Sequence, residues 1–193
     1  MEADFEIQVG GDAPVIEALW EGFVDLRRSP ERIAEISEAV GFPALAQALL
    51  ALNGAGSTLW TAKCDVWDPH ALGLDESVPG HSVPSEPRHA ALACYIDLLP
   101  LSFRVFATWK DAENFCRRWV SQLDMPETCE DASGATLNAT VDLIVRQALA
   151  GAVEGFGITA YLGGVADYRT SADEALAAAL ELFVAACLAI PTS

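Results

Sequence analysis

Two segments of strict alternation, residues 59–67 and 92–98, most constrain the fold of this chain. A period of two is that of a β-strand with one apolar and one polar face. The first segment is predicted to bury Trp60, Ala62, Cys64 and Val66 and to turn Thr61, Lys63, Asp65 and Trp67 outward. The second is predicted to bury Leu92, Cys94, Ile96 and Leu98 and to turn Tyr95 and Asp97 outward. Both segments therefore indicate a sheet with one buried face.

Three other segments change to the three- and four-residue spacing of amphipathic helices. The first, residues 30–53, begins at Ser29-Pro30, an N-cap residue followed by a proline, and is interrupted by Gly41 and Pro43. The second covers residues 108–123. The third covers residues 171–190, where Ser171 and Glu174 have the spacing of a capping box.

The remaining strand predictions complete the fold class. They are residues 5–9, 21–27, 141–148 and 156–165, the last two forming a hairpin, although 141–148 also suits a helix. Strand pairs separated by helices predict a single α+β domain over residues 1–193. It would have a largely antiparallel, or mixed, β-sheet, with about three helical segments on one face and the other face partly solvated. A mixed α/β sheet is the alternative, and residues 68–89 are predicted to form an irregular polar loop.

The charge of the chain narrows the choice of partners. It has 28 acidic and 11 basic residues, a formal net charge of −17, and its adjacent basic pairs are Arg27-Arg28 and Arg117-Arg118. Such a surface repels nucleic-acid phosphates and anionic membranes, so we expect neither as a partner. It favours a basic protein partner, although acidity more commonly serves only to keep a protein soluble.

Cysteine usage and hydropathy indicate the compartment. The five cysteines form an odd set without a C-x-x-C pair, and the sequence starts without a basic and apolar leader, which predicts reduced thiols and a cytoplasmic location. Residues 42–62 carry no charge, but proline, glycine and polar residues interrupt them. We therefore predict no transmembrane segment.

Signals for catalysis, metals and cofactors are weak. The three histidines, His70, His81 and His89, all lie in the 68–89 loop, where Asp68, Asp75 or Glu76 would be the additional ligands of a metal site. Their spacing matches no local metal signature, so they are only weak metal candidates. Cys64 is predicted to face the core, and no phosphate-binding motif is present. We assign no catalytic residue and no cofactor.

The outward residues of the strands are the best binding candidates. An exposed tryptophan near charged groups is a common interaction anchor. The predicted recognition surface consists of Lys63, Asp65, Trp67, Tyr95, Asp97 and Tyr161. A catalytic pair of Asp65 and Asp97, with Lys63, Tyr95 and Arg146 nearby, is a less favoured reading of the same face than ordinary cross-strand charge pairs.

Three hypotheses for function follow. The first is a non-enzymatic interaction or regulatory module that binds a basic protein partner through this acidic, aromatic-bearing sheet face. The alternative is a small enzyme or ligand-binding protein with a metal or polar site at the 68–89 histidine loop. The third is a homo-oligomer formed through a sheet edge or an apolar helix face.

Overall fold

The computed structural model describes residues 2–69, 90–101, 104–122, 129–130, 136–166 and 169–190. The His70, His81 and His89 candidates lie outside the described residues. The strands are β1 (Glu2–Ile7), β2 (Ile16–Ala18), β3 (Leu59–Trp67), β4 (Ala90–Pro100), β5 (Cys129–Glu130), β6 (Thr136–Ala150) and β7 (Val153–Ala166). The helices are the 3-10 helix η1 (Pro30–Glu35) and the α-helices α1 (Ser37–Gly41), α2 (Pro43–Leu52), α3 (Trp109–Gln122) and α4 (Arg169–Ala189).

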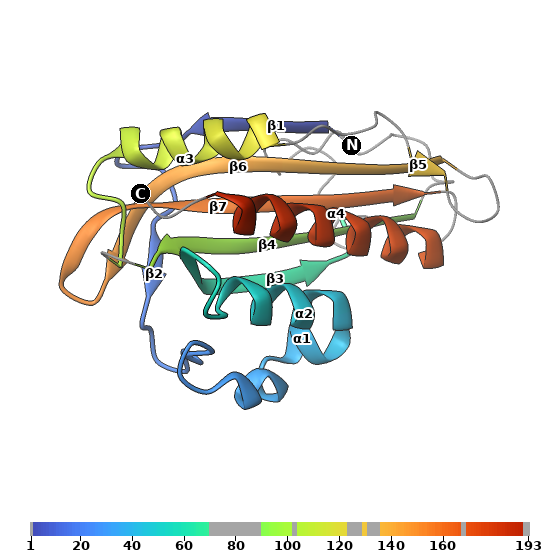
Figure 1. The fold of residues 1–193 in the computed structure, drawn as a ribbon, viewed down its shortest axis with the longest axis horizontal. Helices are drawn as coiled ribbons and strands as arrows, with labels where there is room; N and C mark the ends of the chain where they lie inside the picture. Colours follow the sequence, from blue (N-terminus) through green and yellow to red (C-terminus); the bar gives the residue numbers. More distant parts are fainter. Residues whose placement is uncertain are drawn as a thin grey trace.

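The strands form a mixed but mainly antiparallel sheet in the order β1-β6-β7-β4-β3 (Figure 1). The long hairpin of β6 and β7 lies at its centre, and β3 is the strand at one end. β1 and β2 pair in parallel with successive parts of β6, while β5 pairs with its beginning. The α+β class is thereby confirmed, including the mixed sheet.

The α-helices all pack on the same face of the sheet. α4 lies across β7, β6 and β4, α3 lies over β1 and β6, and α2 lies beside β3 and α4 (Figure 1). The main core fills the space between helices and sheet. Its largest fully buried members include Trp119, Phe183 and Leu143. We call this the helix-covered face and the opposite one the helix-free face, because no helix of the described residues packs on it.

Several predicted elements need correction. Residues 21–27 form turns joined by irregular backbone rather than a strand, and the short strand in this region is β2 at Ile16–Ala18. The predicted helix over 30–53 consists of η1, α1 and α2, and Ser29 makes no side-chain cap. The 141–148 segment is a strand, as its hairpin reading predicted, within the longer β6. The last helix begins at Arg169, before the predicted cap.

A β-bulge in β3 overturns part of the predicted facing pattern. The pairing with β4 shifts between Thr61 and Cys64, because one extra residue is accommodated there. Beyond the bulge, Cys64 and Val66 face the helices as predicted. Before it the order is reversed, so Trp60 and Ala62 lie on the helix-free face, in a second buried cluster. The bulge explains the error, since one inserted residue exchanges the two faces of a strand.

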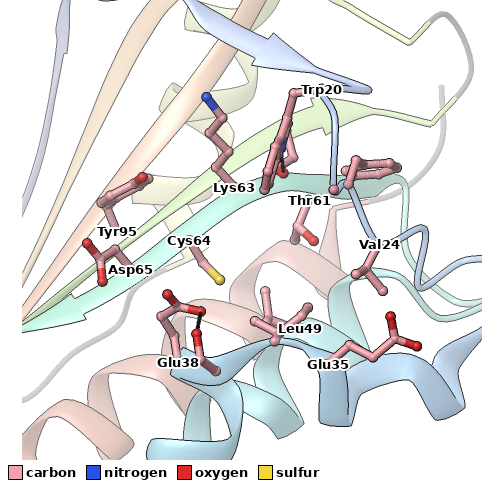
Figure 2. Close-up of a pocket in the computed structure, with 15 residues that line it drawn as sticks. Trp20, Val24, Glu35, Glu38, Leu49, Thr61, Lys63, Cys64, Asp65 and Tyr95 are labelled. Carbon is pink, nitrogen blue, oxygen red and sulfur yellow. Dashed lines mark hydrogen bonds between the residues drawn. The ribbon is translucent and has the colours of Figure 1, made fainter.

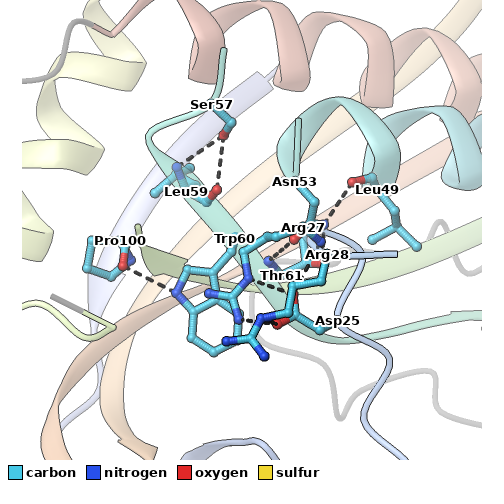
Figure 3. Close-up of polar contacts among 10 residues, drawn as sticks. All are labelled: Asp25, Arg27, Arg28, Leu49, Asn53, Ser57, Leu59, Trp60, Thr61 and Pro100. Atoms are coloured by element: carbon cyan, nitrogen blue, oxygen red, sulfur yellow. Dashed lines mark hydrogen bonds and ion pairs between the residues drawn. The ribbon is translucent and has the colours of Figure 1, made fainter. Parts of the chain in front are cut away.

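This second cluster is built around Trp60, which is 1% exposed. Its indole Nε1 donates to the Pro100 carbonyl at 3.2 Å, and the Arg27 guanidinium lies 4.0 Å from its ring centroid (Figure 3). Asp25 accepts two hydrogen bonds from the Arg27 guanidinium and one from the Arg27 backbone amide, which lower the pKa of that carboxyl. The segment containing β2 and Phe23 thus covers one end of the helix-free face.

Asn53 connects the end of α2 to the edge strand β3. Its side-chain amide nitrogen donates to the Leu49 carbonyl and to the Thr61 hydroxyl, and its Oδ1 accepts from the Thr61 backbone amide at 3.2 Å (Figure 3). The Thr61 backbone amide is therefore paired even though no strand of the described residues lies on that side of β3. The first part of β3 is thus a protected edge.

Candidate functional site

One row of side chains crosses the helix-free face from edge to edge. The strand register places the following residues directly beside one another: Asp4 on β1, Asp142 on β6, Tyr161 on β7, Tyr95 on β4 and Asp65 on β3. Asp4 and Asp65 are exposed, and the two tyrosines are half-buried. The row therefore has aromatic rings at its centre and carboxylates at both ends.

Trp67 joins the two tyrosines in a compact aromatic cluster. Its ring centroid lies 6.2 Å from that of Tyr95 and 6.5 Å from that of Tyr161, and the tyrosine centroids are 6.1 Å apart. The cross-strand neighbours between Trp67 and β7 are Ala93 and Gly163, which leave room for the indole above them. The contact of three rings across three strands follows from these small neighbours.

Asp97 and Arg146 lie next to the aromatic cluster and are both 7% exposed. The Thr159 hydroxyl donates to Asp97 Oδ1 at 2.6 Å, and Arg146 donates from Nη1 to the Tyr161 hydroxyl and from Nη2 to Gln8 Oε1, both at 3.2 Å. Burial raises the pKa of Asp97 to about 6, although the Thr159 bond and the charges of Arg146 and Lys63 act against that rise. The polar centre of this face is thus partly desolvated.

Two donors on this face are buried without an acceptor. They are Trp67 Nε1 and Arg146 Nε, for which no hydrogen-bond partner is found among the residues that the structure describes. A buried donor without a partner costs free energy, on the order of 1–3 kcal/mol. Their presence distinguishes this face from the helix-covered face, where Trp119 Nε1 donates to the Phe183 carbonyl at 3.3 Å.

The structure brings the six predicted recognition residues onto one region, with different exposures. Asp65 is exposed, Lys63, Trp67, Tyr95 and Tyr161 are half-buried, and Asp97 is buried. Asp97 is therefore a supporting group rather than a contact residue. Asp65 is not among the charges that act on Asp97, which gives no support to a coupled pair of carboxylates.

A pocket opens at the edge of the sheet, beside this face. It has a volume of about 450 Å³ and lies between β3, the 20–24 segment and the start of α1 (Figure 2). Lys63, Asp65 and Tyr95 line it, so half of the predicted recognition residues border both surfaces. Its other walls include Trp20, Phe23, Glu35, Glu38, Leu49 and Cys64.

Trp20 is held over the pocket by an unusual turn. Leu19 has a φ of 61°, and Gly22 has a φ of 94° with the Trp20 ring 3.0 Å from the position a Cβ would take. Both are left-handed conformations that few residues adopt without strain, which glycine avoids. The Trp20 Nε1 donates to the Ala62 carbonyl at 3.4 Å, at the β3 bulge.

The sequence did not reveal Trp20 or Glu38 as parts of these surfaces, whereas it did place Arg146 near Asp65 and Asp97 on the outward face. Trp20 and Glu38 come from irregular or helical segments that approach β3 only in the folded chain. Arg146 does carry a signal, since it lies at an outward position of the predicted 141–148 strand, between Val145 and Gln147. Its approach to Tyr161 depends on the register of β6 and β7, which the sequence does not specify.

The chemistry of acids, thiols and metals is limited in the described part of the chain. Burial raises the pKa of Cys64 to about 12, with the nearby carboxylates of Glu38, Asp65 and Asp97 adding to the effect. Its thiol therefore stays protonated and is a poor nucleophile. Within the described ranges, no cluster of three or more histidine, cysteine or acidic side chains has the arrangement of a metal site.

Among the described helices, none is both long and apolar enough to span a bilayer. No family model matches the chain, and neither a curated protein nor a solved structure shows significant similarity to it. The helix-free face and the edge pocket are therefore the features that bear on function.

Proposed function

We propose that the protein is a non-enzymatic interaction or regulatory module that binds a basic protein partner through its helix-free face. The observation that carries the proposal is the row of Asp4, Asp142, Tyr161, Tyr95 and Asp65, with Trp67 packed against its centre. Clustered aromatic residues supply most of the energy in many interfaces, and flanking charges fix orientation.

Charge complementarity selects the partner. The whole chain carries a formal net charge of −17, and the exposed residues Asp4, Glu6 and Asp65 place carboxylates at both edges of the face. Arg146 is buried and hydrogen-bonded, so it adds little positive potential at the surface. A lysine- or arginine-rich surface would meet carboxylates at the rim and aromatic rings at the centre, where its basic side chains stack well.

The cytoplasm is the compartment that we propose for this interaction. Cys64, Cys94, Cys116 and Cys187 are free thiols, and all but Cys64 are buried. Reduced cysteines of this kind are typical of proteins that stay in a reducing compartment.

The test is comparative capture from the native lysate. Wild-type protein, the Trp67→Ala variant and the control variant Glu181→Gln, which alters an exposed residue of α4, are immobilised and washed at low and at high salt. We expect wild type and Glu181→Gln to retain the same basic protein at low salt only, and Trp67→Ala to lose most of it. The captured protein is then purified and its affinity for each variant is measured.

Two results would contradict the proposal. One is a partner that binds Trp67→Ala as tightly as wild type. The other is the absence of any basic protein that binds with a salt-dependent affinity. A metal or polar ligand site in the 68–89 loop, and a homo-oligomer, stay as alternative predictions, which metal analysis and light scattering of the purified protein would address.

A further inference from the structure

The pocket at the β3 edge has features of a ligand site, and Tyr95 is the one member of the aromatic cluster that also lines it. Its volume of about 450 Å³ lies within the range of about 300–1,000 Å³ that is typical of small-molecule sites. Three aromatic residues, Trp20, Phe23 and Tyr95, contribute to its lining, and Leu49 adds an apolar wall. Such a surface suits a ligand with an apolar body.

The charged groups of the pocket are mostly negative. Glu35 is paired with Arg32 at 2.7 Å, which neutralises it. Glu38 and Asp65 have no ion-pair partner among the described residues, and Glu38 accepts a hydrogen bond from the Ser37 hydroxyl. Two carboxylates are thus available to a ligand at the mouth of an aromatic-lined pocket.

The one lysine in the lining points away from Glu38. Lys63 and Trp20 lie on one side of β3, whereas Cys64, Glu38 and Glu35 lie on the other (Figure 2). The Lys63 ammonium is 5.6 Å from the centroid of the Trp20 ring. Lys63 therefore leaves Glu38 uncompensated, and the protonated Cys64 thiol beside Glu38 contributes no negative charge.

We infer that this pocket binds a cationic group, an ammonium or a guanidinium, carried on an apolar body. The cation would lie between Glu38 and Asp65, and the apolar body would pack on Trp20, Phe23 and Leu49. The source is either a free amine or a basic side chain of a protein. The inference does not rest on the proposed function, because Trp67 is not part of the pocket lining, although Asp65 and Tyr95 border both surfaces.

The experiment is an NMR titration that follows the Trp20 indole resonance of the isotope-labelled full chain. Phenethylammonium and butylguanidinium are the cationic probes, and phenethyl alcohol is the neutral control. We expect both cations to shift the Trp20 resonance in a saturable way and the alcohol to bind much more weakly. The Glu38→Gln variant should weaken cation binding about fivefold, whereas the matched variant Glu181→Gln should leave it unchanged.

Further arms identify the source and separate this inference from the proposed function. An arginine-rich peptide that shifts Trp20 at lower concentration than butylguanidinium would indicate a protein side chain, and equal or weaker binding would indicate a free amine. Trp67→Ala should leave phenethylammonium binding unchanged. Gly22→Ala, which crowds the Trp20 ring, should weaken it.

The inference would be overturned by any of three results. These are the absence of a saturable Trp20 shift with either cation, equal binding of the alcohol, and equal affinity of the Glu38→Gln and Glu181→Gln variants for the cations. The two proposals fail separately. Trp67→Ala tests partner binding by the helix-free face, and Glu38→Gln tests cation binding by the pocket.

Discussion

The two faces of the sheet are made by the same strands but differ in the kind of side chain that they bury. On the helix-covered face, alternate residues such as Leu143 and Ile158 are fully buried against α3 and α4. On the helix-free face, the same strands place Tyr161, Arg146 and Asp97. Arg146 and Asp97 are buried and Tyr161 is half-buried. Arg146 Nε has no acceptor among the described residues, and burial raises the pKa of Asp97. Apolar burial on the helix-covered face stabilises the fold. Polar groups that are buried on the helix-free face cost free energy where they are incompletely paired.

The helix-free face is itself divided. At one end, β2 and Phe23 cover Trp60 and form a small second core. At the other, Trp67 and two tyrosines are only half-buried. The difference indicates that stability is concentrated under the helices and around Trp60, while the Trp67 region is less buried and is the part that we propose for contacts with a partner.

The largest effect should come from the helix-covered core. Trp119 is fully buried, with its ring centroid 5.5 Å from that of Phe183. Trp119→Ala should lower the free energy of unfolding by about 3 to 5 kcal/mol, because it leaves a large cavity. Urea denaturation followed by circular dichroism measures this loss. A loss below that of Trp67→Ala would contradict the assignment of the main core.

Trp60→Ala should have the next largest effect. It removes a buried indole, its hydrogen bond to Pro100 and its stacking with Arg27. We expect a loss of about 3 kcal/mol in the free energy of unfolding, because the small second cluster relaxes more readily than the main core. The same denaturation experiment applies. A change near zero would mean that this end of the face is not a core.

Asp97→Asn should stabilise the protein at neutral pH. Because burial raises the pKa of Asp97 to about 6, the folded state holds its proton more tightly than the unfolded state does. The wild type should therefore lose stability as pH rises from about 4 to about 6, and then show no further loss from this group. The variant lacks that loss and should be more stable by about 3 kcal/mol at neutral pH.

Paired unfolding curves of wild type and Asp97→Asn across this range provide the measurement. Their difference isolates Asp97 from the other acidic groups, whose mutual repulsion is common to both proteins. A constant difference across the pH range would show that the variant acts through its hydrogen bond to Thr159 instead.

Trp67→Ala should have the smallest effect on stability. Its indole is half-buried and its Nε1 has no hydrogen-bond partner in the described part of the chain, so about 1 kcal/mol of unfolding free energy is expected to be lost. Partner binding should fall much more than stability does. Thermal unfolding and affinity measurements on the same preparation separate the two effects, and an equal loss in both would assign Trp67 to the core.

The sequence predicted the class of the fold and much of the helix-free face. Alternation in residues 92–98 placed Tyr95 and Asp97 on the correct side, because β4 is regular throughout. It failed at Trp60, because no glycine or proline marks the bulge near Ala62. The parallel pairing of β1 with β6 and the edge pocket depend on contacts between distant segments, which local patterns do not encode.

The alternation of apolar and polar residues also did not predict how deeply each outward side chain is buried. The sequence placed Asp97 outward, yet that side chain is buried beside Thr159 and Arg146. Alternation gives the side of a strand on which a residue lies. It does not say whether neighbouring side chains cover the residue there.

The five tryptophans provide the most direct test of the central claim, that the helix-free face binds the partner. The indole resonances of Trp20, Trp60, Trp67, Trp109 and Trp119 report on different parts of the molecule. They are recorded by NMR with and without the purified basic partner. The account predicts that Trp67 shifts or broadens strongly while Trp119 stays unchanged. An unchanged Trp67, with the largest shift at Trp109 on α3, would place the interface on the helices and contradict the account.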